Sequence, residues 1–332
     1  MIRLSARSAS SRLACVATLL VFSLPALQAA AQDQAPTGAD VAAPAPAAAP
    51  VFPKPDPANF TATTPTKETV NAFLQTSWGY DENRMWQVQA ILKTAVEGLS
   101  KVVVYVGDKS GKQKPGVFPF FVLADGKHII AGNDIVSFGE HPYADTRAVL
   151  QKRADGPFRG GPAKDLELVE FADFQCPHCK LAQPNMEKLA ADFPKARIVF
   201  QPFPLVAIHP SAALAAAYAS CVAKNAGNDA FFLFANTVFE GQDGLNTPDG
   251  ATLTLNSAVT KAGLEPAKIA ACAETPAAKA QVEAWIALAK DLDINETPML
   301  MVNGRMVPIG GIPYDTLKQI VAFQAKLDGV SQ

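Results

Sequence analysis

Apolar residues recur along the chain with two different periods, and the change of period marks two folded regions. In the first region Val70, Phe73 and Leu74 are spaced as on one face of a helix, and residues 86–92 are also predicted to be helical. Runs of strand-forming residues separated by turn residues then predict a small antiparallel meander at 102–106, 117–123 and 128–132. Residues 66–153 are therefore predicted to form a small α+β domain.

The second region, residues 164–330, starts with a strand–helix–strand pattern. An apolar strand at 166–171 leads into a helix at 176–192, and another strand follows at 196–201. This order within so short a stretch predicts two parallel strands joined by a right-handed crossover. A helical stretch at about 209–293 precedes two more strands and a last helix, which are predicted at 299–302, 305–309 and 313–327. The region is therefore predicted to be an α/β domain with a helical insertion.

Two stretches rich in small residues and proline flank the first domain. Residues 32–65 are dominated by alanine and proline and cannot build a packed core, so we predict a disordered, locally extended linker there. Residues 154–163 combine glycine and proline, which favour turns, and are predicted to link the two domains.

The first 31 residues have the pattern of a secretory signal peptide. Arg3, Arg7 and Arg12 precede a mostly apolar run at 13–27, and the alanines at 29–31 suit a cleavage site. The run is short for a transmembrane span, although an uncleaved anchor is the alternative. We therefore expect the chain to be exported and the signal peptide to be removed.

Charge and cysteine content narrow the functional classes. The chain has 332 residues and a formal net charge of −2, so we expect no nucleic-acid partner, because such proteins carry a basic surface. Of its five cysteines, Cys15 lies in the signal peptide and four remain after cleavage. An even number of cysteines in an exported chain is compatible with an oxidising compartment.

Two of these cysteines lie where the strand at 166–171 meets the following helix, in the sequence Cys176-Pro177-His178-Cys179. The amino end of a helix favours a negative sulfur, so we expect Cys176 to be a thiolate well below the usual thiol pKa. Pro177 suits the first turn of a helix, and a protonated or donating His178 would favour the thiolate further. Cys179 is close enough to form a disulfide with Cys176. The pattern predicts a reversible dithiol–disulfide couple with a stable reduced form, which makes it an oxidising one.

Other uses of a Cys-x-x-Cys pair fit this sequence less well. A zinc site would need a second such pair or histidines at ligand spacing, and the four histidines show none. A c-type haem site would need histidine at the position of Lys180. We therefore expect no metal and no cofactor. A purely structural disulfide is the remaining alternative, although so short a loop stabilises a fold little.

The second domain resembles the DsbA superfamily, whose members have a thioredoxin fold with an inserted helical domain. The resemblance covers residues 166–327 and rests on the order of elements, on Cys176-Pro177-His178-Cys179 and on Thr297-Pro298 before a strand. It implies that Pro298 is cis and faces the cysteine pair. Together with Thr297 it would bind an extended substrate beside the reactive sulfur, and Thr297 would tune the Cys176 thiolate.

Further residues of the second domain receive candidate roles. Glu170 matches the buried carboxylate of thioredoxin-like proteins, which would have a raised pKa and relay the proton of Cys179 in the second exchange step; a strand residue facing solvent is the alternative. Asp173, Gln175 and His209 are expected to be capping, rim or core residues. Two cysteines in different helices of the insertion are either buried thiols or a structural disulfide, which an oxidising compartment favours: Cys221 and Cys272.

The first domain resembles the N-terminal dimerisation domain of DsbC/DsbG-type disulfide isomerases. The resemblance rests on residues 125–132 and covers 102–139. It implies a homodimer through residues 66–139 that holds two catalytic domains across a cleft for unfolded substrate. A small sheet that packs against its own catalytic domain is the alternative.

Together these features predict a periplasmic thiol–disulfide interchange protein that forms or isomerises disulfides in exported proteins. Its expected partners are unfolded or partly folded exported proteins and a membrane redox partner that resets the cysteine pair. The residues at the cysteine pair favour oxidation, whereas the N-terminal meander favours isomerisation, so the direction stays open. A dimeric holdase-type chaperone with secondary redox chemistry is the alternative function.

Overall fold

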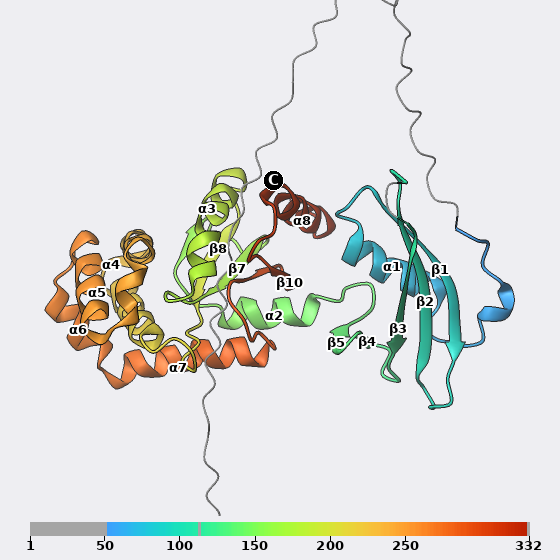
Figure 1. Cartoon of the computed structure of the whole chain (residues 1–332), viewed down its shortest axis with the longest axis horizontal. Coiled ribbons are helices and arrows are strands. Elements are labelled where there is room, and N and C mark those ends of the chain that lie inside the picture. Colours follow the sequence, from blue (N-terminus) through green and yellow to red (C-terminus); the bar gives the residue numbers. More distant parts are fainter. Residues whose placement is uncertain (1–51, 112–113, 331–332) are drawn as a thin grey trace, which may run out of the picture. The chain divides into compact units, whose positions relative to one another are not determined.

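The computed structural model describes residues 52–111 and 114–330 (Figure 1). The predicted signal peptide, residues 1–31, and the linker up to residue 51 lie outside the described residues. Among the described helices, none combines the length and apolar character that crossing a membrane requires.

The first domain is a helix packed on an antiparallel five-stranded sheet. Helix α1 (Lys67–Trp78) begins where the Thr66 side chain accepts a hydrogen bond from the Thr69 N–H, which satisfies one of the unpaired amides of the first turn. The strands follow in sequence order across the sheet: β1 (Arg84–Lys93), β2 (Ser100–Asp108), β3 (Gly116–Val122), β4 (His128–Ala131) and β5 (Asp134–Ser137). Val70 and Leu74 of α1 pack on Val102, Val104 and Phe120 and form the core of this domain.

The predicted helix at 86–92 is wrong, because this segment belongs to strand β1. Glutamine, alanine and leucine favour a helix locally, but Trp86, Val88 and Ala90 alternate with polar Gln87 and Gln89. The strand pairs with β2 along nearly its whole length, with a register shift between Val88 and Ala90. Pairing with β2 therefore overrides the local helical preference.

The predicted linker also ends earlier than expected, since residues 53–62 lie along the free edge of β1. A short 3-10 helix, η1 (Pro57–Asn59), is capped by the Asp56 side chain. Phe60 then bridges to Ile91, and the amides of Thr61 and Ala62 both donate to the Ile91 carbonyl. This segment covers an edge strand that would otherwise expose unpaired backbone groups.

The second domain is built on a mixed five-stranded sheet with the order β10-β9-β7-β8-β6. Strands β7 (Glu167–Ala172) and β8 (Arg197–Pro202) are parallel and are joined through helix α3 (Pro177–Asp192). Strands β9 (Met299–Val302) and β10 (Arg305–Pro308) continue the sheet in antiparallel pairing. The last strand, β6 (Phe158–Gly160), pairs with β8 inside the stretch predicted to be a linker, so that prediction is wrong for these three residues.

Helices cover both faces of this sheet (Figure 1). Helices α3 and α8 (Tyr314–Leu327) pack on one face around Leu168 and Val302. Helices α2 (Ala144–Arg153) and α7 (Pro276–Asp291) pack on the other face around Val169 and Phe171. Because alternate residues of β7 point to opposite faces, this central strand contributes to both cores. Its carboxyl end is thereby fixed where α3 begins.

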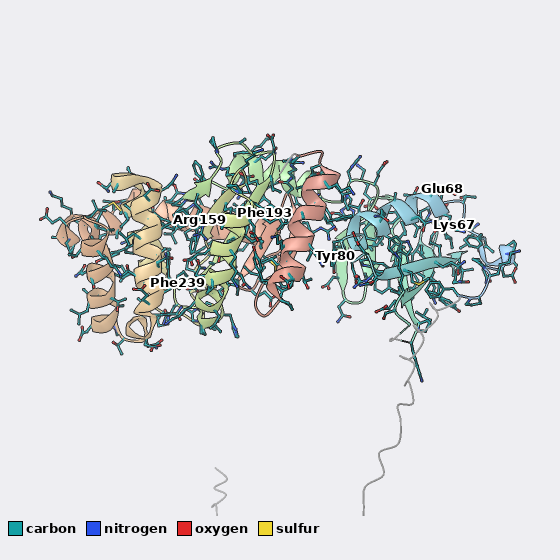
Figure 2. The ribbon with its side chains drawn as sticks, turned by 90° about the horizontal axis from the view of Figure 1, so that it is seen from above. Lys67, Glu68, Tyr80, Arg159, Phe193 and Phe239 are labelled. Carbon is teal, nitrogen blue, oxygen red and sulfur yellow. A yellow bond between two sulfur atoms is a disulfide. The ribbon has the colours of Figure 1, made fainter. Side chains whose placement is uncertain are left out.

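The predicted helical insertion lies between β8 and β9. Its elements are α4 (Ala212–Glu240), the 3-10 helix η2 (Gln242–Asn246), α5 (Pro248–Lys261), α6 (Pro266–Ala273) and α7 (Pro276–Asp291). A kink at Gly227, with φ at +79°, divides α4 into two helical segments. The insertion has an aromatic and alanine-rich core that includes Phe239 of α4, whereas Phe193, just after α3, belongs to the core under α8 (Figure 2).

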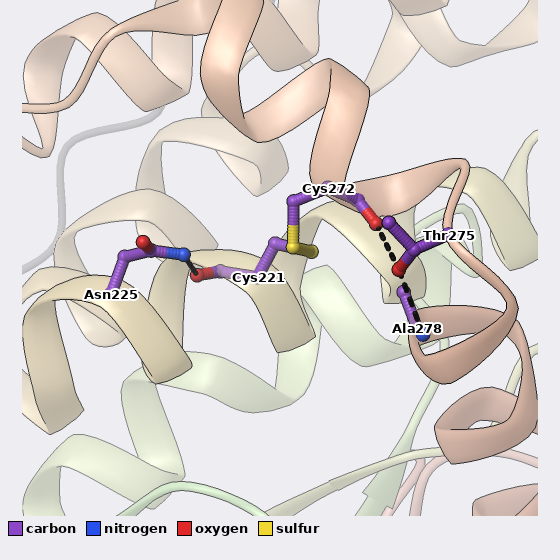
Figure 3. Close-up of a disulfide and its surroundings, with 5 residues drawn as sticks. All are labelled: Cys221, Asn225, Cys272, Thr275 and Ala278. Carbon is purple, nitrogen blue, oxygen red and sulfur yellow. Dashed lines mark hydrogen bonds between the residues drawn. A yellow bond between two sulfur atoms is a disulfide. The ribbon is translucent and has the colours of Figure 1, made fainter.

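Cys221 of α4 and Cys272 of α6 form a disulfide with their Cα atoms 6.0 Å apart (Figure 3). This confirms the bridge that was one of two alternatives from the sequence. It closes a loop of 51 residues, which in the chain-entropy model stabilises a domain by about 4 kcal/mol. The observed elements confirm the predicted fold class, an α/β domain with a helical insertion preceded by a small α+β domain.

Candidate active site

The two cysteines at the start of α3 differ in exposure. Cys176 is the N-cap residue of α3, with extended backbone, and Pro177 takes the first helical position, where a missing N–H costs nothing. Cys176 is 5% exposed and Cys179 is fully buried. Both are free thiols in this structure, so it describes the reduced state.

The surroundings of Cys176 favour a thiolate. A hydrogen bond from the Cys179 side chain lowers the pKa of Cys176 most, and Thr297 and the backbone N–H groups of Cys179 and His178 lower it further. These contacts outweigh burial and bring the pKa of Cys176 down to about 5. Donors that converge on one sulfur at a helix amino end are the usual cause of an acidic cysteine.

Cys179, in contrast, is kept as a neutral thiol. Burial raises the pKa of Cys179 well above the ordinary thiol value, and its hydrogen bond to Cys176 raises it further. The Asp173 N–H donates to the Cys179 sulfur at 3.4 Å but does not offset the burial. At neutral pH the pair therefore carries one negative charge, on Cys176.

The loop before β9 supplies the other side of the site. The Thr297–Pro298 peptide bond is cis, as the resemblance implied. The Thr297 carbonyl oxygen accepts a hydrogen bond from the Cys176 thiol at 3.5 Å, although the two residues are 121 positions apart. The central position of β7, paired with β9 on one side and followed by α3, brings them together.

Glu170 lies inside the domain, so the alternative of a strand residue facing solvent is wrong. Its side chain is on β7 and the residue is 2% exposed. Burial raises the pKa of Glu170 to about 7, although a hydrogen bond from Gln183 and the positive charge of Arg159 both lower it. The Gln183 amide donates to Glu170 Oε1 at 2.8 Å and to the Cys179 carbonyl at 3.2 Å. One side chain thus links the carboxyl group to the buried cysteine.

His178 lies at the exposed rim of the site together with Pro177. Its contribution to the low pKa of Cys176 comes from its backbone N–H. Stabilisation of the thiolate by the imidazole ring stays a prediction.

A buried aspartate next to the site has more partners than the sequence suggested. Asp173 accepts hydrogen bonds from the Gln175 N–H at 2.7 Å, the Leu205 N–H at 2.8 Å and His209 Nδ1 at 2.7 Å. Asp173 does not cap α3, whose N-cap is Cys176 without a side-chain cap, but holds the turn before it. The pair with His209, 36 residues away, has no signal in local spacing. This carboxylate ties the turn before Cys176 to the segment after β8.

The part of the chain that the structure describes contains no group of three or more histidine, cysteine or acidic residues that could hold a metal ion. The groups that lower the pKa of Cys176 are the Cys179 thiol, Thr297 and the peptide N–H groups of Cys179 and His178, which suit a sulfur anion. The site can therefore carry out thiol chemistry with its own residues.

Comparisons with known proteins connect this domain to one family. The family model described as Thioredoxin matches residues 152–322. A curated relative, the Na(+)/H(+) antiporter NhaA 3 of Salinispora tropica, is 34% identical over 91 residues, which are 27% of this chain. The chain spans only 14% of the length of that protein.

Solved structures with similarity to the chain include a periplasmic thioredoxin-like protein from Salmonella enterica serovar Typhimurium. It is 23% identical, with 55% of this chain and 96% of that chain covered and a TM-score of 0.44. ScsC of Proteus mirabilis in a transitional conformation is 26% identical, with 56% and 82% covered and a TM-score of 0.45.

We predict that Cys176 ionises with a midpoint near pH 5 in the reduced protein. The absorbance of the thiolate near 240 nm, followed across a pH series, would measure this. Cys176→Ser should remove the transition, and Cys179→Ala should move it upward because the largest hydrogen bond is lost. A depressed thiol pKa stabilises the folded reduced form above the ordinary thiol pKa. That stabilisation is lost as the pH falls through about 5. A midpoint near the ordinary value of about 8.5 would contradict the described site.

Proposed function

The chain belongs to the thioredoxin family, and on that premise we propose that it is an exported thiol–disulfide oxidoreductase that acts on the cysteines of other exported proteins. The observation that carries the proposal is that the two thiols of the pair have opposite pKa shifts. The pKa of Cys176 is lowered, whereas burial raises that of Cys179 and keeps it neutral. An acidic thiol is a good leaving group and makes the reduced form the stable one. We therefore propose that the main direction is oxidation of substrate.

The proposed reaction has two exchanges. In the first, a substrate thiolate attacks the Cys176 sulfur of the oxidised enzyme, the Cys176–Cys179 bond breaks, and Cys179 leaves and takes up a proton. In the second, another substrate thiolate attacks the substrate sulfur of the mixed disulfide, and Cys176 leaves as a thiolate. The substrate loses two electrons and gains one disulfide, while the enzyme gains the two electrons. A membrane redox partner would then accept them and restore the oxidised enzyme.

Glu170 is the proposed source of the proton for Cys179, which in this reaction leaves in the first exchange and not in the second, where the relay was expected from the sequence. Its pKa of about 7 allows it to exist in either form near neutral pH, and Gln183 connects it to the Cys179 backbone. The same carboxylate would accept the proton when Cys179 attacks in the reverse direction. Thr297 and Pro298 are proposed to bind extended substrate beside Cys176.

We propose the bacterial periplasm as the location. The predicted signal peptide supports export, and the disulfide between Cys221 and Cys272 is of the kind that persists in an oxidising compartment.

A homodimer through residues 66–139 is proposed from the edges of the first sheet. The edge at β1 is covered by residues 53–62, whereas β5, among the residues that the structure describes, pairs with β4 alone. On β5, Ile135 is 67% and Val136 is 42% exposed. An open apolar edge strand favours pairing with a second strand, and a second copy of β5 would satisfy both edges at once.

A redox titration tests the proposed direction. We expect the Cys176–Cys179 pair to have a reduction potential well above the value of about −270 mV for a reducing thioredoxin. The oxidised protein should form disulfides in reduced ribonuclease, and Cys176→Ser should be inactive. A strongly oxidising potential without refolding of scrambled ribonuclease would reject isomerisation. If cells with Cys176→Ser had the wild-type phenotype and the variant still suppressed aggregation, the holdase function would replace the enzymatic one.

Glu170→Gln should slow the step in which Cys179 leaves. We expect a rate about 10- to 100-fold lower below pH 7, where Glu170 holds the proton, and little difference well above pH 7. Stopped-flow reduction of the oxidised protein by a dithiol peptide would measure it, since the ratio of wild-type to variant rates cancels the ionisation of the peptide. Glu187→Gln, an exposed change on helix α3, which carries Cys179, is the control and should leave the rate unchanged. A constant ratio across pH would exclude the relay.

Ile135→Lys should convert the proposed dimer into a monomer. A charge on β5 would have to be buried against the second copy, so we expect dissociation to be favoured by at least about tenfold. Mass measurement in solution over a range of protein concentrations would show it. Leu253→Lys, a change at an equally exposed leucine in the insertion, is the control. A wild-type protein that is monomeric at all concentrations would exclude this interface.

A further inference from the structure

The helical insertion contacts the backbone of the reactive cysteine through one buried amide. Gln242, the first residue of η2, is 6% exposed. Its Nε2 donates to the Phe174 carbonyl at 2.8 Å and to the Cys176 carbonyl at 2.9 Å. One side chain therefore holds the two carbonyl groups that flank Gln175, in the turn that leads from β7 into α3.

Gln175 provides a second connection between this turn and the insertion. Its Oε1 accepts from the Ser211 N–H at 2.9 Å, and its Nε2 donates to the Leu245 carbonyl at 3.2 Å. Ser211 Oγ donates to the same Leu245 carbonyl at 2.7 Å. Ser211 precedes α4 and η2 follows it, so residues at both ends of α4 form hydrogen bonds with the turn.

The Cys176 carbonyl is part of the first turn of α3. It accepts hydrogen bonds from the N–H groups of Cys179 at 3.1 Å and Lys180 at 3.3 Å. The direction of the first N–H groups of α3 depends on the backbone at Cys176, since this residue is the N-cap. Without Gln242 the buried Phe174 carbonyl would lose its donor, and a buried carbonyl without a partner drives the backbone to rearrange.

We infer that Gln242 is a positioning residue for Cys176, which keeps the turn in the geometry where the N–H groups of α3 point at the sulfur. This inference rests on the proposed function, because it explains how the insertion contributes to the reactive thiol. The insertion is then part of the active site, although it contributes no reacting atom. Within the insertion, the Cys221–Cys272 bridge ties α4 to α6 (Figure 3).

Two substitutions of Gln242 test this inference. In Gln242→Ala we expect the ionisation midpoint of Cys176 to rise by about one pH unit, so that labelling of Cys176 by iodoacetamide at pH 5 falls about fivefold. Gln242→Met keeps the approximate size of the side chain without adding a charge. Its thioether cannot donate to the carbonyls, so we expect a rise of similar size.

Asn225→Ala is the matched control. Asn225 Nδ2 donates to the Cys221 carbonyl at 2.7 Å, so this variant also removes a bond from a side-chain amide to the backbone of a cysteine in the insertion, away from the active site (Figure 3). It should leave the Cys176 midpoint unchanged. If Gln242 had a purely structural role, Gln242→Ala and Asn225→Ala would lower the stability of the protein equally. The Cys176 ionisation midpoint would then be unchanged in both variants.

The outcomes separate this inference from the proposed function. A wild-type midpoint near 5 that is unchanged in folded Gln242→Ala would overturn the role of Gln242 and leave the oxidoreductase standing. If Gln242→Ala does not fold, an unchanged midpoint in Gln242→Met would overturn it instead. A wild-type Cys176 that titrates like a free cysteine would overturn the proposed function itself.

Discussion

The reactive site depends on one electrostatic constraint, which is that a negative sulfur must be kept at the amino end of α3. Cys176 meets it because peptide N–H groups, the Cys179 thiol and Thr297 all lower its pKa. Each of these groups comes from a different feature: the helix start, the spacing of the two cysteines and the loop before β9. A disulfide uses up this charge, so every interaction that favours the thiolate also favours the reduced protein over the oxidised one.

The sheet is what places these groups together. Strand β7 is central, so its carboxyl end lies beside the loop before β9 and leads directly into α3. The same strand carries Glu170 into the interior at 2% exposure. Asp173 accepts a hydrogen bond from the Leu205 N–H and so ties the turn to the segment after β8, while Gln175 donates to the Leu245 carbonyl and ties it to the insertion. The rigid core and the reactive turn are thus built from consecutive residues of one segment.

The resemblance to the DsbA superfamily and to thioredoxin-like proteins implied the position of Thr297 and Pro298 and the burial of Glu170. Local sequence patterns were enough to predict the fold class and the cysteine pair. They failed where contacts between distant residues decide the structure. Residues 86–92 are a strand because they pair with β2, and β6 exists because three residues of an apparent linker pair with β8. The partners of Gln242 and His209 lie dozens of residues away, and glutamine and histidine carry no periodicity that would reveal them.

The protonation states of the two thiols and of Glu170 also depend on one another. The Cys176 thiolate raises the pKa of Cys179 through its charge and hydrogen bond, and burial acts in the same direction. Between the two pKa values the reduced pair therefore holds one proton, so its formation from the disulfide takes up two electrons and one proton. That proton has to reach a buried sulfur that water cannot easily approach. A buried carboxyl group with a pKa of about 7 can hold such a proton near neutral pH, which is why the burial of Glu170 and that of Cys179 are parts of one arrangement.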